Sequence, residues 1–120
     1  MTTKAVETLL AQLKPAKVEI NIHVSAMVNV TPFVARQKVN GVLVDKVGTG
    51  VISGDPDLTI TEGRLCWRVP IILALPGGGN LGQVGTVDVD VQTGEVLADD
   101  LLLNEIAHHA DRFAARTTLS

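Results

Sequence analysis

Two aspartates, Asp88 and Asp90, stand two residues apart in the segment VGTVDVDVQTGEVL at residues 84–97. In a strand, such residues share one face and lie about 7 Å apart, a spacing at which two carboxyl groups can act as general acid and base. The residues between and around them are valines, which predicts that both aspartates face outward with ordinary pKa values. Asp90 also precedes a Thr-Gly turn whose N–H groups its carboxylate can accept. We therefore interpret the pair as structural.

A thiol and an imidazole, Cys66 and His23, are the second candidate, because a nearby base can activate a cysteine as a nucleophile. Cys66 alternates with Trp67, which places it on the face away from the core, and His23 lies on the polar side of its own segment. No third residue is placed to orient the pair, so a structural cysteine is favoured. Arg68 would join Cys66 and His23 at the mouth of a pocket if the chain were an enzyme or a small-ligand binder.

Metal and dinucleotide chemistry are each suggested by one further pattern. On the last helix, Glu105 and His109 are one turn apart, whereas His108 and His109 point about 100° apart, and two ligands do not make a structural site. The glycines at 77, 79 and 82 spell G-x-G-x-x-G. That motif needs a helix directly after it, and a strand is predicted there instead. We expect neither a metal nor a cofactor.

The composition limits the possible classes of protein. The 120 residues carry a net charge of −3, and 46% of them are hydrophobic, enough for one domain with its own core. Three aromatic residues are too few for the stacking platforms of a single-strand nucleic-acid binder. No segment approaches the ~20 apolar residues of a membrane helix, no signal peptide is recognisable, and the single cysteine cannot form an internal disulfide. We expect a cytoplasmic protein that binds neither nucleic acid nor membrane.

The elements that must position these residues follow from periodicity. An amphipathic helix is predicted at 3–13 and a long strand at 18–30, where apolar and polar residues alternate. Thr31-Pro32 predicts the start of a helix over 32–47, although Asn40-Gly41 is also typical of a hairpin turn. Strands are expected at 58–61, 65–75 and 84–92, the last followed by a turn into residues 95–97.

A last helix, capped by Asp99 or Asp100, closes the chain. Pro70 cannot donate to a strand neighbour and should lie beyond the end of the strand that pairs with residues 65–67. These elements predict a single α+β domain over 1–120. Its antiparallel sheet of four to five strands would carry helices packed on one face, in the order helix-strand-helix-strand-strand-strand-helix.

Three pieces of the sequence form a recognisable series: the helix at 32–47 followed by Gly48, the WRVPIIL strand at 67–73, and the closing VDVQTGEV pattern at 89–96. Together they resemble the PepSY domain family. The resemblance covers about residues 31–98, to which an N-terminal helix and strand and a C-terminal helix are added. It implies a module that binds or inhibits a protein, and it supplies no catalytic residues.

These observations predict a non-enzymatic protein-interaction or regulatory module with an unidentified protein partner. The alternative is a small-ligand binder or enzyme with a pocket between sheet and helices. A homodimer is also expected, because Met27, Cys66 and Ile72 would leave a weakly polar outer sheet face to be covered. The predicted helix at 3–13 could cover the same surface within one chain.

Overall fold

The chain folds into two helices and five strands in the computed structural model, which describes residues 17–48, 50–74 and 79–119. The helix predicted at 3–13 lies outside the described residues. In chain order the elements are α2 (Pro32–Lys46), β1 (Val51–Ser53), β2 (Asp57–Thr61), β3 (Arg64–Ala74), β4 (Asn80–Asp90), β5 (Val96–Leu97) and α3 (Asp100–Leu119).

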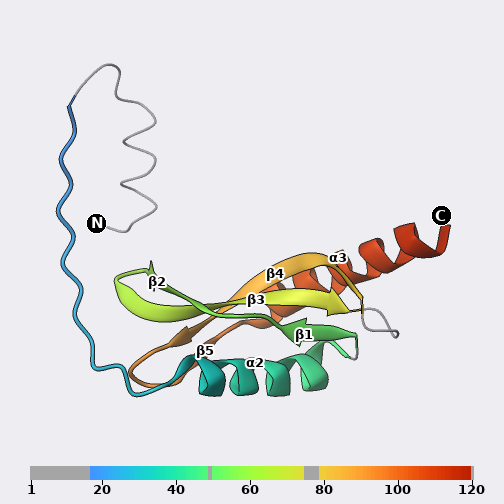
Figure 1. The fold of residues 1–120 in the computed structure, drawn as a ribbon, viewed down its shortest axis with the longest axis horizontal. Coiled ribbons are helices and arrows are strands. Elements are labelled where there is room, and N and C mark those ends of the chain that lie inside the picture. Colours follow the sequence, from blue (N-terminus) through green and yellow to red (C-terminus); the bar gives the residue numbers. More distant parts are fainter. Residues whose placement is uncertain (1–16, 49, 75–78, 120) are drawn as a thin grey trace.

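All the strand pairs are antiparallel, and β3 is the centre of the sheet (Figure 1). β4 pairs with one side of β3, and β5 pairs with β4. β1 and β2 both pair with the other side of β3, opposite residues 71–73 and 64–68 respectively. The predicted α+β fold with an antiparallel sheet is confirmed. β1 was not anticipated, because three residues are too few to show a period.

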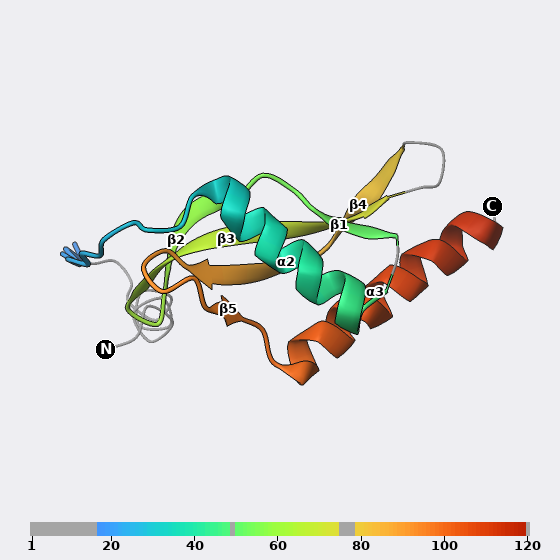
Figure 2. The same cartoon turned by 90° about the horizontal axis from the view of Figure 1, so that it is seen from below.

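The two helices pack on the same face of this sheet, and Figure 2 shows α2 crossing it. On β3, the residues that alternate with Cys66 face the core: Val69 and Ile71 are fully buried, and Trp67 packs against the core. Val69 and Ile71 belong to one hydrophobic cluster with residues of α2, α3 and β4, among them Val39, Leu43, Val87, Val89 and Ile106. The opposite face of β2, β3 and β4 is here called the outer face. Because the apolar residues are buried on the helix-bearing face, the outer face carries mainly polar groups.

Local signals explain the boundaries of α2. The hydroxyl of Thr31 accepts the backbone N–H of Val34 at 3.1 Å, and Pro32 occupies the first turn. At the other end Gly48 has φ of 115°, and its N–H donates to the carbonyl of Leu43. The helix predicted at 32–47 is therefore confirmed, and the hairpin turn considered at Asn40-Gly41 is wrong.

A tight turn joins β2 to β3. Glu62 and Gly63 have φ of 52° and 76°, the left-handed conformation that a two-residue hairpin loop requires. Beyond the end of β2, Pro70 lies in the gap before β1, where its carbonyl accepts the N–H of Gly54. The expected position of Pro70, where no neighbour needs an N–H group from it, is confirmed.

The strand predicted at 18–30 is wrong as a member of the sheet. Residues 17–29, here called the strap, are extended but pair with no strand among the described residues. Residues 24–26 line a small hollow with the β2–β3 turn, and Figure 1 shows the strap continuing from there beyond the sheet. The N–H groups of Asn29 and Val30 both donate to the carbonyl of Val91, which anchors the C-terminal end of the strap. Alternation predicts an extended chain correctly, but it carries no information about which edge, if any, will pair with it.

Candidate functional site

Two arginine–aspartate pairs lie side by side on the outer face, where β3 and β4 run together. Arg64 Nε donates to Asp90 Oδ2 at 2.9 Å, and its Nη2 donates to Glu95 Oε2 at 2.9 Å. Arg68 donates from Nε and Nη2 to the two oxygens of Asp88, at 3.0 and 3.1 Å. Both arginines come from β3 and both aspartates from β4, so strand register alone brings the charges together.

Asp90 is buried, with 7% of its surface exposed, and its carboxylate accepts three hydrogen bonds. The N–H groups of Thr93 and Gln92 donate to its Oδ1 at 2.9 and 2.8 Å. Donation from Thr93 and then Gln92, together with the charge of Arg64, lowers the pKa of Asp90 although burial opposes this. Its predicted role in the turn is confirmed, whereas an exposed carboxylate with an ordinary pKa is wrong.

Asp88 is also covered, since only 12% of its side chain is exposed. Besides Arg68, the hydroxyl of Thr61 donates to Asp88 Oδ2 at 2.7 Å from β2. The expectation that Asp88 faces solvent is therefore wrong, although it does lie on the outer face. Arg68 and Thr61 both donate hydrogen bonds to this carboxylate, and these contacts hold its orientation fixed.

Cys66 lies between the two arginines along β3 and directly opposite Asp90. It is on the outer face as expected, yet it is fully buried. Burial first, and then the negative charges of Asp88 and Asp90, raise the pKa of its thiol. Since the thiolate is the reactive form of cysteine, this environment favours a structural role.

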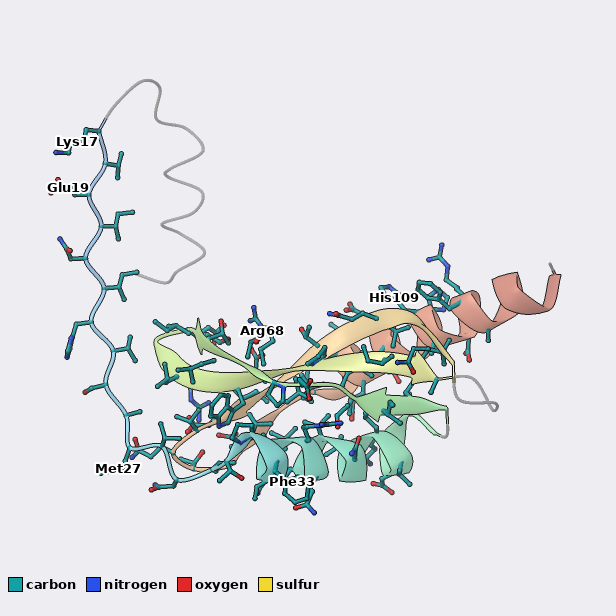
Figure 3. The ribbon with its side chains drawn as sticks, in the orientation of Figure 1. Lys17, Glu19, Met27, Phe33, Arg68 and His109 are labelled. Carbon is teal, nitrogen blue, oxygen red and sulfur yellow. The ribbon has the colours of Figure 1, made fainter. Side chains whose placement is uncertain are left out.

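His23 does not join this cluster. It is exposed on the strap, and it makes no hydrogen bond or ion pair among the described residues. Figure 3 shows the labelled residues of the strap, Lys17, Glu19 and Met27, well apart from Arg68 on the sheet. A site that combines His23 with Cys66 and Arg68 is therefore not assembled in this chain.

A groove of about 550 Å³ opens beside the charge cluster, at the start of α3. It is lined by Arg64 and Asp88, by further acidic residues, and by an apolar strip, in full Thr61, Glu62, Arg64, Asp88, Glu95, Val96, Leu97, Ala98, Asp99 and Leu102. Asp99 already caps α3, because its Oδ1 accepts the N–H of Leu102 at 2.8 Å. The groove combines apolar lining with excess negative charge.

The histidine-containing helix forms a second hollow, of about 410 Å³, against β4. Glu105 and His109 both line it, which confirms that they share one face of α3, and Figure 3 labels His109 on this helix. His108 and Asp111 are exposed and do not line it. Within the part of the chain that the structure describes, no three histidine, cysteine or acidic residues come together as a metal site would require.

The glycine-rich segment meets the expectation from the sequence where the structure describes it. β4 begins at Asn80, so a strand and not a helix follows Gly79, and Gly82 lies within β4. Gly77 lies outside the described residues. This arrangement lacks the helix N-terminus that would face a pyrophosphate.

Three residues of the outer face were missed by sequence reasoning, namely Thr61, Arg64 and Glu95. Arg64 had a usable signal, because it stands two residues before Cys66 and therefore shares its face. The surface proposed for a dimer also changes. Cys66 is fully buried and Ile72 half-buried on β3, whereas Met27 is 69% exposed on the strap, outside the sheet.

Comparison of the chain with protein-family models, with curated proteins and with solved structures gave no match. Of the helices described, neither combines the length and the apolar character needed to cross a membrane. The functional argument therefore rests on the contacts and exposed surfaces of this chain.

Proposed function

We propose that this chain is a protein-binding module that acts by strand addition, with the strap as the segment it offers. The observation that carries the proposal is the exposed apolar side of residues 17–29. On the even-numbered, apolar side Val18, Ile20, Ile22 and Val28 are each more than a third exposed and Val24 is half-buried, and Met27 on the other side is exposed as well. Such a row of neighbouring apolar groups in water marks an interaction surface.

The backbone of the strap supports the same conclusion. Only Asn29, at its end, donates a backbone hydrogen bond to the rest of the described chain. An extended segment with free N–H and C=O groups can add to the edge of a sheet, where the main chain supplies affinity and alternate side chains supply specificity. The strap has such a main chain, and its side chains alternate between apolar and polar along it.

The outer face supports binding over catalysis. Its carboxylates are engaged by Arg64 and Arg68, and the pKa of Cys66 is raised, so these groups are suited to holding β2, β3 and β4 together. We include in the proposal a PepSY-like regulatory role and a cytoplasmic location. They are supported by the VDVQTGEV pattern and by the single cysteine, respectively.

The test compares two variants that add the same charge to opposite sides of the strap. Ile22→Asp alters the apolar side, and Asn21→Asp is the matched control on the polar side. A partner recovered with the parent chain, then purified, should bind the parent and Asn21→Asp equally in titration calorimetry and bind Ile22→Asp at least tenfold more weakly. Equal binding to both variants, or amide protection of the strap in the isolated monomer, would contradict the proposal.

A further inference from the structure

We infer that the strap of each chain pairs with the outer edge of β2 in a second copy, giving a homodimer with exchanged strands. The inference rests on the proposed function and names its partner. It follows from three features of the described residues: one bare sheet edge, a match between side-chain patterns, and the direction in which the strap leaves its own sheet.

β1 and β2 form one edge of the sheet. The outward backbone groups of Ser53 on β1 have side-chain partners, whereas those of β2 have none among the described residues. At Ser53 of β1, the N–H donates to Asn40 Oδ1 at 2.9 Å and the carbonyl accepts Arg36 Nη2 at 3.0 Å. Side chains of α2 thus occupy the groups that a new strand would need. β2 pairs only with β3 among the described strands, and no such side chain covers the outer edge of residues 57–61. Alternate backbone groups there point away from the sheet.

The side chains of β2 and the strap have complementary patterns. Leu58 and Ile60 lie on the helix-bearing face, since they pair with Trp67 and Leu65, and Leu58 is 54% exposed. Thr59 and Thr61 lie on the outer face. A strand added at this edge buries most apolar surface if its own apolar residues alternate in the same way, as the even-numbered residues 18–28 do.

The direction of the strap favours a second copy over the chain's own edge. Trp67 Nε1 donates to the carbonyl of Val30 at 2.7 Å, which together with the contacts to Val91 fixes the point of departure. From there the strap runs outward (Figure 1), and its thirteen residues reach about 40 Å. Residues 17–31 contain no glycine or proline to reverse the chain. Reciprocal exchange closes the assembly at two copies.

Light scattering at micromolar concentration is the first test. The parent chain should have twice the 12.7 kDa mass of one copy, and either Ile22→Asp or Leu58→Asp should reduce the mass to that of one copy. Two controls should remain dimeric: Asn21→Asp on the polar side of the strap, and Leu101→Asp, which replaces an apolar side chain on α3 that is 68% exposed. Circular dichroism checks that every variant is folded. A parent chain of monomer mass, or a dimer that survives both test variants, would overturn the inference.

Cross-linking identifies the surfaces in contact. An affinity-tagged Ile22→Cys chain and an untagged Leu58→Cys chain are refolded together and treated with a short bismaleimide. The expected product is a covalent heterodimer, and the parent chain is the control because its Cys66 is buried. Cross-linking only between two Ile22→Cys chains, or none at all, would overturn the inference. If the parent is monomeric and the strap binds a different protein, the proposed function stands and only the exchange between copies fails.

Discussion

Arg64 Nε lies 2.9 Å from Asp90 Oδ2 across the β3–β4 pair, and the other oxygen of the same carboxylate accepts two N–H groups of the following turn. Asp90 thereby links a charge on the central strand to the turn that leads into β5. The backbone continues this link, since Asp90 N–H donates to the carbonyl of Glu95 at 2.9 Å. Replacing this one carboxylate should affect both features.

The pH dependence of stability should report on Asp90. Its pKa lies below the ordinary value of 3.8 in the folded chain, so its contribution is fully present above that value and is lost as the pH falls through the lower, folded pKa. We expect Asp90→Asn to destabilise the chain at about pH 7 and to differ less from the parent at about pH 3. Urea denaturation at both pH values measures this. A difference that stays constant or grows toward low pH would contradict it.

Two substitutions at Asp90 should differ in cost. Asp90→Asn keeps an oxygen for the N–H groups of Gln92 and Thr93 and should cost about 1 kcal/mol, whereas Asp90→Ala leaves both without an acceptor and should cost about 1–3 kcal/mol. Chemical denaturation at neutral pH compares the two free energies of unfolding. Equal costs would mean that the two hydrogen bonds in the turn contribute nothing measurable.

The pair formed by Arg68 and Asp88 should show energetic coupling. Each single alanine substitution leaves the other charged side chain without its partner. The double substitution removes both Arg68 and Asp88, so no unpaired charge remains. We expect a coupling energy of about 1 kcal/mol from the double-mutant cycle. Arg68 is exposed, whereas Asp88 is covered. Arg68→Ala should therefore lower the free energy of unfolding more than Asp88→Ala does, because it leaves a covered carboxylate without its charged partner. Strict additivity would show that the pair contributes no stability.

Cys66 should be inert in the folded protein. Its thiol is fully buried and its pKa is raised, so an aromatic disulfide reagent should react only after denaturant is added. Met27→Cys places a second thiol on the exposed strap and serves as a positive control within the same chain. Fast modification of Cys66 in the native parent chain would instead support the alternative of a reactive cysteine.

Gly85 should tolerate a side chain poorly. A Cβ there would lie 2.7 Å from Cγ1 of Ile106, so Gly85→Ala should push α3 from β4 and cost about 1–3 kcal/mol. Gly41 is the matched control. A Cβ there meets nothing within 4 Å, and Gly41→Ala in exposed helix should stabilise by up to about 1 kcal/mol. Thermal unfolding of both variants measures the contrast, and an unchanged midpoint for Gly85→Ala would contradict this packing.

The sequence by itself determined the elements whose signals are local. Thr31, Pro32 and Gly48 define α2 because capping and turn conformations depend on the residues at the helix ends. The alternation along β3 defined its core face, since the strand period is a property of the chain. The acceptor role of Asp90 was also predictable, because the turn that it serves is three residues away.

Only the tertiary structure decided what lies beside these elements. Asp88 and Asp90 lie on β4 and are covered by Arg64 and Arg68 of β3. These arginines are distant in sequence from the aspartates, so no local pattern predicts the register that brings them together. The strap is a second case in which the local pattern did not predict the strand pairing. Its alternation predicts an extended conformation, but a strand also needs an edge with unpaired backbone groups. Within one chain, the strap is anchored at Val30 and Val91 and pairs with no described strand.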